Sequence, residues 1–297
     1  MSVERILLTN DDGIDAVGFR TLYDALAADY DVVAVAPTGD RSSVGRAISA
    51  DVAVTDHDLG YAVDGTPVDC VVAGLDEFVP DADLVVAGCN EGANLGAYTL
   101  GRSGTVSAVV EASFFGVPGI ATSMYVPGGD DWWKRELPPA SFAHAVRATR
   151  FLVDEADAAG VFEGADYLNV NAPMAEPAEG DGGSEAVAGD GGSAAPEPAD
   201  SVASDPVLGA AVNPAPMRVT TPSEWYGMEA ASDGNGGLSI SDPIWGRMTP
   251  GDVPDPVGTD RRAVVDGEVS VSPLSVPHAA APDAGLDELA DRYGNGA

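Results

Sequence analysis

The sequence is organised around residues 6–13, which read ILLTNDDG. A short apolar run stops there at two adjacent carboxylates, Asp11 and Asp12, and then at Gly13. Such a run is typical of a parallel strand buried on both faces, although a buried helix segment has the same hydropathy. The acids would then lie at the carboxyl end of the strand, where open α/β sheets bind ligands. Because Asn, Asp and Gly are ordinary turn residues, the stretch alone is equally consistent with a simple turn.

Helix and strand patterns alternate after this stretch. Residues 17–30 carry apolar side chains at spacings near 3.6, which predicts an amphipathic helix, and residues 31–37 (DVVAVAP) predict a second strand. A parallel pair joined by a helix forms a right-handed crossover unit. We therefore predict an α/β fold with a doubly wound, Rossmann-like, mostly parallel sheet. Further strands are predicted at residues 84–88, 119–124 and 167–171, short strands or a hairpin at 52–63, and helices from 67, at 103–115 and at 141–158.

The composition divides the chain into three parts. Residues 1–174 are the predicted α/β core, and residues 206–297 are a smaller C-terminal region rich in β-hairpins, with β segments at 217–221, 238–245 and 268–276 and a helix near 286–293. Between them, residues 175–205 contain no aromatic side chain and are mostly Gly, Ala, Pro, Ser, Asp and Glu. Such a segment cannot bury enough apolar surface to offset its ordering entropy, so we expect a disordered acidic insert.

The charge balance excludes several kinds of partner. The chain has 48 acidic and 14 basic residues, for a net charge of −34, and Lys134 is its only lysine. This surface would repel nucleic acid phosphates and anionic membranes, so we expect no stable nucleic acid partner and no membrane partner. A halophilic cytoplasm explains the acidity, because in molar salt the Debye length falls to roughly 3 Å and screens self-repulsion.

The two cysteines, Cys70 and Cys89, lie in no Cys-x-x-Cys or Cys/His cluster, which argues against a zinc site. No basic segment followed by an apolar stretch opens the chain, and no run approaches the ~20 apolar residues of a membrane span. We expect a soluble protein in a reducing cytoplasm.

Polar, glycine-rich loops follow the predicted strands. Residues 38–46 hold hydroxyls and two arginines, and residues 89–96 read CNEGANLG. The helix predicted from residue 103 begins SGT. A helix amino end offers free N–H groups and a positive dipole end, so Ser103 and Thr105 suit a phosphate site. The alternative is that Ser103 is an ordinary N-cap.

Five motifs occur in order along the chain: NDDG at 10–13, RS at 41–42, GTPVDC at 65–70, NEGANLG at 90–96 and SGT at 103–105. Together they resemble the survival protein SurE family of 5′-nucleotidases. The resemblance runs through roughly the first 125 residues and returns in LNVN at 168–171, GTD at 258–260 and VSVSPL at 269–274. It departs from the family in the acidic insert, in a tryptophan-bearing insertion near residue 132 and in the loop at residues 43–46, which leave the preferred nucleotide open.

The resemblance implies a metal-dependent phosphomonoesterase that hydrolyses nucleoside 5′-monophosphates to nucleoside and phosphate. It implies Asp11 and Asp12 as catalytic residues, and a metal set of Asp11, Asp12, Ser42 and Asn90. It also implies a phosphate-binding set of Asn94, Ser103, Gly104 and Thr105. Oxygen-only ligation suits one Mg²⁺ or Mn²⁺ ion. The family further implies a homodimer or homotetramer, with contacts from the C-terminal region.

One point of chemistry and two alternative functions stay open in the sequence. The metal could lower the pKa of a bound water, or Asp11 or Asp12 could accept the water's proton. A covalent aspartyl-phosphatase is an alternative enzyme, although that chemistry usually needs Asp-x-Asp. A non-catalytic phospho-receiver is a second alternative, but receivers use a lysine after a late strand, whereas Lys134 lies in the tryptophan-bearing insertion.

Overall fold

A computed structural model of the chain describes residues 3–128, 135–175, 214–232 and 234–276. Its main sheet has nine strands: β1 Arg5–Thr9, β2 Asp31–Pro37, β3 Ala53–His57, β4 Gly60–Asp64, β5 Leu84–Glu91, β6 Gly119–Tyr125, β7 Tyr167–Pro173, β8 Met217–Val219 and β11 Val269–Leu274. A separate two-stranded sheet pairs β9 Glu229–Ser232 with β10 Leu238–Ser241. The α-helices are α1 Val17–Leu26, α2 Pro67–Ala73, α3 Ala97–Leu100, α4 Gly104–Phe114, α5 Ala143–Glu155 and α6 Asp260–Val265. Short helical turns lie at Gly74–Phe78, Pro139–Phe142, Val161–Glu163 and Trp245–Arg247.

The strand order confirms the predicted doubly wound sheet. The order is β3-β4-β2-β1-β5-β6-β7-β11-β8, and only the β3–β4 and β7–β11 pairs are antiparallel. The chain enters at β1, builds outward through β2 and β4, then returns to β5 and builds the other way through β6 and β7. The crevice between the ends of β1 and β5 is therefore the topological switch point, where such sheets bind ligands.

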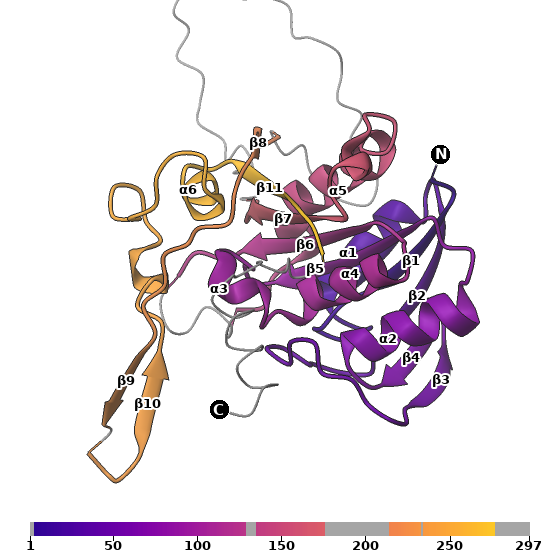
Figure 1. Ribbon diagram of the computed structural model, residues 1–297, viewed down its shortest axis with the longest axis horizontal. Helices are drawn as coiled ribbons and strands as arrows, with labels where there is room; N and C mark the ends of the chain where they lie inside the picture. The colour runs from indigo at the N-terminus through magenta and orange to yellow at the C-terminus, as the bar shows by residue number, and fades with distance from the viewer. Residues whose placement is uncertain (1–2, 129–134, 176–213, 233, 277–297) are drawn as a thin grey trace, which may run out of the picture.

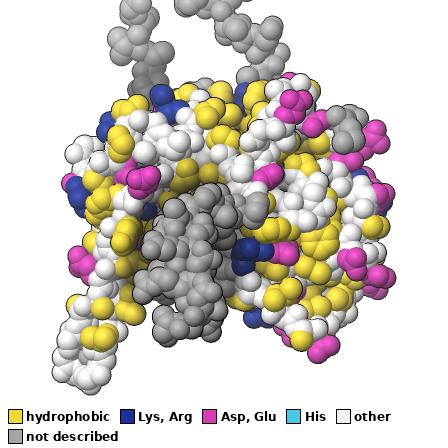
Figure 2. All heavy atoms as spheres, viewed as in Figure 1, with side chains coloured by type: hydrophobic (Ala, Val, Ile, Leu, Met, Phe, Trp, Pro, Cys, Tyr) yellow, Lys and Arg dark blue, Asp and Glu magenta, His cyan; other side chains and the backbone are white. Residues whose placement is uncertain are grey.

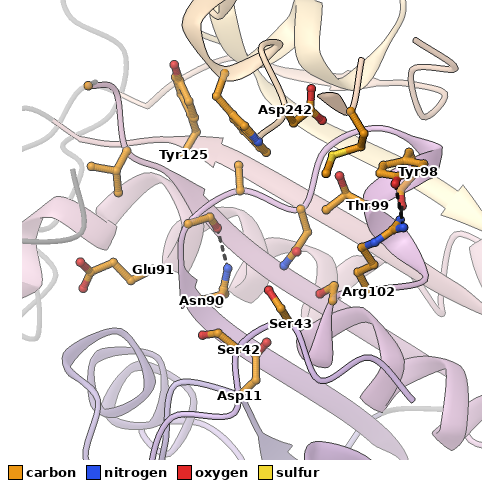
Figure 3. A pocket seen from close by; sticks show the side chains of 18 residues that line it. Asp11, Ser42, Ser43, Asn90, Glu91, Tyr98, Thr99, Arg102, Tyr125 and Asp242 are labelled. Carbon is orange, nitrogen blue, oxygen red and sulfur yellow. Dashed lines mark hydrogen bonds between the residues drawn. The ribbon is translucent and has the colours of Figure 1, made fainter. Parts of the chain in front are cut away.

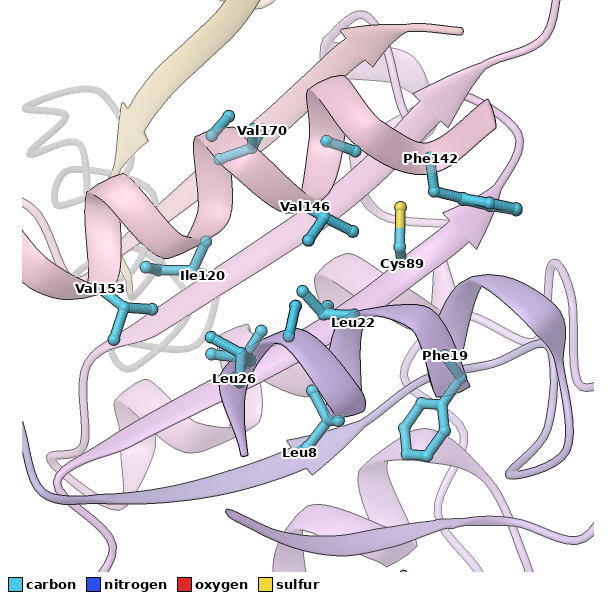
Figure 4. Packing of buried hydrophobic residues seen from close by; sticks show 14 of the residues in the cluster. Leu8, Phe19, Leu22, Leu26, Cys89, Ile120, Phe142, Val146, Val153 and Val170 are labelled. Atoms are coloured by element: carbon cyan, nitrogen blue, oxygen red, sulfur yellow. The ribbon is translucent and has the colours of Figure 1, made fainter. Parts of the chain in front are cut away.

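Helices cover both faces of the sheet, so the central strand is buried on each side. Ile6, Leu7 and Leu8 of β1 are all fully buried. Ile6 and Leu8 pack with α1 and α5, while Leu7 packs with α2 and α4. Figure 4 shows the first of these layers, in which side chains of α1 and α5 meet over the strands. The uninterrupted apolar run is thus explained by burial on two faces.

The C-terminal region contributes to both sheets. Two of its predicted β segments join the main sheet, since β11 pairs antiparallel with β7 and β8 pairs parallel with β11. The third forms β10, which projects from the body with β9 as a hairpin (Figure 1). Two elements are shorter than predicted. The strand predicted at 238–245 ends at Ser241, before Pro243 and a 3-10 turn. The helix predicted at 17–30 ends at Leu26.

Three predictions fall outside the described residues. They are the acidic insert beyond residue 175, the tryptophans at 132 and 133, and the helix near 286–293. Within the part that the structure describes, no helix is both long and apolar enough to span a membrane.

Candidate active site

The turn after β1 carries Asp11 and Asp12 into the crevice beside β5. Asn10 closes this turn, because its Nδ2 donates to the Gly13 carbonyl at 2.8 Å and the Gly13 N–H donates to its Oδ1 at 3.2 Å. Gly13 has φ of +103°, and a Cβ there would lie 2.9 Å from the Cα of Gly39. The stretch is therefore a strand end and a turn at once.

Asp11 connects β1 to the amino end of α4. Its carboxyl is buried, and Oδ1 accepts a hydrogen bond from Thr105 Oγ1 at 2.6 Å. Helix α4 can come this close only because residue 104 is glycine, since a Cβ on Gly104 would lie 2.7 Å from Asp11 Oδ2. The structure thus places Gly104 and Thr105 directly against the first carboxylate.

Asp12 connects β1 to β5, because its Oδ2 accepts a hydrogen bond from the Glu91 N–H at 2.8 Å. Burial, and then the charge of Asp11, raise the pKa of Asp12 to about 8. Burial also raises the pKa of Asp11, against the lowering effect of its hydrogen bonds from Thr105. Two adjacent carboxylates that are costly to ionise fit a divalent cation, whose charge would favour the ionised form of both.

Ser42 and Asn90 bring oxygen atoms to the same place. Asp11, Ser42 and Asn90 all line one cavity of about 370 Å³ and lie together at one side of it (Figure 3). Ser42 Oγ donates to Asp40 Oδ1 at 2.6 Å, and Asn90 Nδ2 donates to the Gly92 carbonyl at 2.7 Å. These bonds use hydrogens and leave the Ser42 Oγ lone pairs and Asn90 Oδ1 available to a cation.

The donor set is chemically mixed. Among the described residues, no group of three or more His, Cys, Asp and Glu side chains could hold a metal ion. A site at this edge would therefore combine two carboxylates with a hydroxyl and an amide oxygen. That all-oxygen set fits a hard divalent ion rather than zinc. Three of the four predicted ligands, Asp11, Ser42 and Asn90, line the cavity, and Asp12 does not.

Ser103 is the N-cap of α4 and also faces the cavity. Its Oγ accepts a hydrogen bond from the Val106 N–H at 3.0 Å. Ser103 is therefore an N-cap, as the alternative reading of the sequence predicted. This role does not exclude contact between its hydroxyl and a ligand. Thr105, by contrast, is fully buried and donates its hydroxyl hydrogen to Asp11. The structure thus assigns these two hydroxyls different partners.

Asn94 is held by two asparagines of β7. The Asn94 N–H donates to Asn171 Oδ1 at 2.8 Å, and its carbonyl accepts from Nδ2 of Asn169 at 2.9 Å and of Asn171 at 3.1 Å. Its own Nδ2 donates to Ser123 Oγ at 2.9 Å. Sequence reasoning gave the two asparagines no role. Their alternate spacing on an otherwise apolar strand was the signal, because it places both side chains on one face.

The C-terminal region holds the same loop from the other side. Asp260, at the start of α6, accepts hydrogen bonds from the Gly96 N–H at 2.7 Å and the Ser223 N–H at 2.9 Å. The fully buried Arg261 donates to the Trp225 carbonyl at 2.6 Å. A Cβ on Gly96 would lie 2.3 Å from this guanidinium. Residues far apart in the chain thus fix the loop that carries Asn94.

The far end of the cavity contains residues that the sequence did not indicate. They come from α3, the end of β6 and the C-terminal region, and no local pattern marks them: Tyr98, Tyr125, Met228, Asp242 and Trp245. Arg102 also lines the cavity and lies near Ser43 (Figure 3). Figure 3 shows Tyr125 and Asp242 across the cavity from Asp11 and Ser42. The cavity therefore has one end lined by oxygen atoms and another that is largely aromatic and apolar.

Known proteins resemble this chain over nearly its whole length. Residues 6–188 match the family described as Survival protein SurE. A protein of Haloquadratum walsbyi named 5′-nucleotidase SurE is 51% identical over 97% of this chain and 96% of its own length. One of Natronomonas pharaonis with the same name is 54% identical over 97% and 99%. The crystal structure of a SurE protein from Aquifex aeolicus has a TM-score of 0.65 at 25% identity, covering 98% of this chain and 99% of that one.

Proposed function

Because this chain belongs to the survival protein SurE family, we propose that it hydrolyses nucleoside 5′-monophosphates to nucleoside and phosphate with the help of a divalent metal ion. The 5′-nucleotidase activity itself is that of the haloarchaeal relatives, which align with this chain over nearly their full length. The observation that supports metal dependence is the pair of adjacent carboxylates at the switch point of the sheet, where Asp11 is buried and Asp12 is partly buried.

The proposed metal ligands are Asp11, Asp12, Ser42 and Asn90. Oδ1 of Asp11 is bound to Thr105 and Oδ2 of Asp12 to the Glu91 N–H, so the other oxygen of each carboxylate is the proposed ligand atom. A bound Mg²⁺ or Mn²⁺ supplies charge neutralisation for the phosphate and a lowered pKa for a water molecule. One of the two carboxylates, Asp11 or Asp12, is the proposed alternative acceptor for the proton of the attacking water, and the two residues are in this sense catalytic.

The proposed phosphate site is the amino end of α4. Its backbone N–H groups and its dipole favour an anion, and Ser103 Oγ faces the cavity beside them. The Asn94 amide completes the set, positioned by Asn169 and Asn171. Gly104 lets the amino end of α4 lie directly against Asp11, because a Cβ there would be 2.7 Å from Asp11 Oδ2, so the proposed phosphate site adjoins the proposed metal site. Thr105 acts in this proposal through Asp11 as well as through its backbone.

The three parts of the chain have different proposed roles. We propose residues 1–174 as the catalytic core, residues 175–205 as an insert that the activity does not need, and residues 206–297 as the part that completes the site and makes oligomer contacts. Asp260 and Arg261 support the completion of the site by this last part, since they fix the loop of Asn94. The acidic composition and the two buried free cysteines support a cytoplasmic location in high salt.

The projecting hairpin supports a homodimer or homotetramer. Leu238 and Ile240 of β10 are each 70% exposed, and Figure 2 shows hydrophobic side chains along this hairpin. A two-stranded hairpin is marginal in water without cover, and a second copy of the chain would provide it. Light scattering in molar salt tests this. A monodisperse monomer would contradict the proposal.

A substrate screen tests the proposed function. The purified protein, in molar KCl, is assayed for phosphate release from nucleoside 5′-monophosphates, nucleoside 3′-monophosphates and polyphosphate, with Mg²⁺, with Mn²⁺ or with a chelator. We expect 5′-monophosphates to be hydrolysed only with metal. Full activity after chelation and dialysis, or trapping of a phosphoryl group on Asp11 or Asp12 during turnover, would contradict the proposed chemistry.

A further inference from the structure

The cavity continues beyond the space that a phosphate and a metal ion need. Its volume of about 370 Å³ lies within the range of roughly 300–1,000 Å³ that is usual for small-molecule sites. Asp11, Ser42 and Asn90 occupy one side, and Tyr125 and Asp242 face them from the other (Figure 3). A nucleotide bound with its phosphate at α4 would therefore place its base among the residues of the far end.

The far end offers an unused apolar surface. Met228 and Trp245 line the cavity and are each 40% exposed, although both side chains are large and apolar. Their neighbours are already engaged. Tyr98 stacks on Tyr226 with ring centroids 5.1 Å apart, and the Tyr125 hydroxyl donates to the Met248 carbonyl at 3.0 Å. The indole and the thioether are exposed in the cavity and make neither of these contacts, so they are available to cover the flat face of a base.

Asp242 is the carboxylate at this end. Its Oδ1 accepts a hydrogen bond from the Ile244 N–H at 3.1 Å, which fixes the side chain at the start of the turn Trp245–Arg247. An ionised carboxylate only accepts hydrogen bonds. The Asp242 carboxylate can therefore bind a base edge that carries adjacent hydrogen-bond donors, and it repels a base edge that carries carbonyl oxygens.

The four common bases differ in this respect. Guanine presents two neighbouring donors, N1–H and the N2 amino group. Adenine and cytosine present one amino group beside a ring acceptor, and uracil presents N3–H between two carbonyls. We infer that Met228, Trp245 and Asp242 form a nucleobase subsite in which Asp242 selects guanine. This inference rests on the proposed function, because it names the base of the nucleotide that the active site hydrolyses.

The test compares kcat/KM for GMP, UMP and ribose 5-phosphate in the intact protein, together with GMP and UMP binding by equilibrium dialysis. Since a hydrogen bond to a charged group is worth roughly tenfold or more in affinity, we expect GMP to exceed UMP by about tenfold. In Asp242→Asn the GMP-to-UMP ratio should fall about tenfold, because an amide can donate to a uracil carbonyl. Trp245→Ala should weaken both nucleotides relative to ribose 5-phosphate.

Asp56→Asn is the matched control, since Asp56 is an exposed carboxylate on the edge strand β3, and its ratio should equal that of the wild type. Equal kcat/KM and equal affinity for GMP and UMP in the wild type, or an unchanged ratio in Asp242→Asn, would overturn the inference. Loss of hydrolysis on every substrate, ribose 5-phosphate included, would refute the proposed function instead. In that case the dialysis ratios alone would still support or overturn the base preference.

Discussion

Asp11 and Asp12 are adjacent, yet different parts of the fold hold them. Thr105 of α4 binds Asp11, and the backbone at the end of β5 binds Asp12. Each carboxylate therefore has one oxygen oriented by a hydrogen bond, and the other oxygen is the proposed ligand atom. This arrangement requires Gly104, because a side chain at that position would overlap Asp11.

The first prediction separates Thr105 from Ser103. Thr105→Val keeps the shape but removes the hydroxyl that orients Asp11, so both metal affinity and turnover should fall, turnover by roughly ten- to a thousandfold. Ser103→Ala removes the cap and a proposed phosphate contact, and should cost about 1 kcal/mol of stability and raise KM while metal affinity stays unchanged. Metal titration and steady-state kinetics check both. Unchanged metal affinity in Thr105→Val would show that the hydroxyl does not serve Asp11.

At the scale of elements, the active site is a set of strand ends held together by polar side chains. Asn171 of β7 both accepts from and donates to the backbone of Asn94. The second prediction is that Asn171→Ala lowers kcat/KM for nucleotides by roughly ten- to a hundredfold, since a small misplacement of a binding group has effects of that size. Steady-state kinetics and Mn²⁺ titration measure it, and metal affinity should be retained.

Thr149→Val is the control for this prediction. It also removes a buried hydrogen bond, to Thr122, but on α5, away from the cavity. Both variants should lose about 1–3 kcal/mol of stability, and only Asn171→Ala should change the kinetics. Equal kinetic constants in the two variants would show that Asn171 contributes to stability and not to substrate binding or turnover.

Local signals predicted the elements well where burial and capping act over short distances. The apolar run of β1 and the Thr66–Pro67 start of α2 are both present, and Thr66 and Asp69 form a reciprocal capping box. The pairing of β11 with β7 could not be predicted, because nothing local marks a partner so distant in sequence. The strand β9, with sequence EAAS, has no strand propensity and exists through its pairing with β10.

The residues of the candidate site also fall into two groups, those that the sequence could predict and those that it could not. Asp11, Ser42, Asn90, Asn94 and Ser103 lie in glycine-rich motifs at strand and helix ends, and the structure brings all five to one cavity. The far end of that cavity is built by single side chains from α3, the end of β6 and the C-terminal region. Such residues carry no pattern, so only the tertiary structure reveals them.

At the scale of the whole molecule, the net charge of −34 sets the conditions for stability. The third prediction is that the melting temperature rises steadily from 0.1 M to 2 M KCl, because the Debye length falls from about 10 Å to 3 Å or less and screens repulsion between surface carboxylates. Figure 2 shows these acidic side chains spread over the visible face. Thermal unfolding followed by circular dichroism measures this. A melting temperature independent of salt would contradict it.

The fourth prediction concerns pH and metal together. The pKa of Asp12 is raised to about 8, above its unfolded value of about 4, so between these pH values the folded state holds a proton that the unfolded state has released. Stability of the metal-free protein from this group therefore falls as the pH rises through that window. A divalent ion binds the ionised pair, so its stabilisation should be larger at pH 8 than at pH 5, by roughly a few degrees in Tm.

Differential scanning calorimetry with Mg²⁺ or a chelator at both pH values measures this difference. Asp12→Asn lacks both this titrating group and a charged ligand, so the metal effect should be small at both pH values in that variant. A metal effect of equal size at pH 5 and pH 8 in the wild type would show that metal binding does not depend on ionisation of Asp12.

The most direct measurement titrates Mn²⁺ into the wild type and Asp11→Asn, in molar KCl, while nucleoside 5′-monophosphate turnover is followed in the same samples. The account predicts one Mn²⁺ per chain in the wild type, with turnover that rises in proportion to the bound ion. It predicts that Asp11→Asn, folded by circular dichroism, loses both, because removing one of two charged ligands weakens a divalent site. Wild-type metal affinity and wild-type turnover in Asp11→Asn would contradict the account.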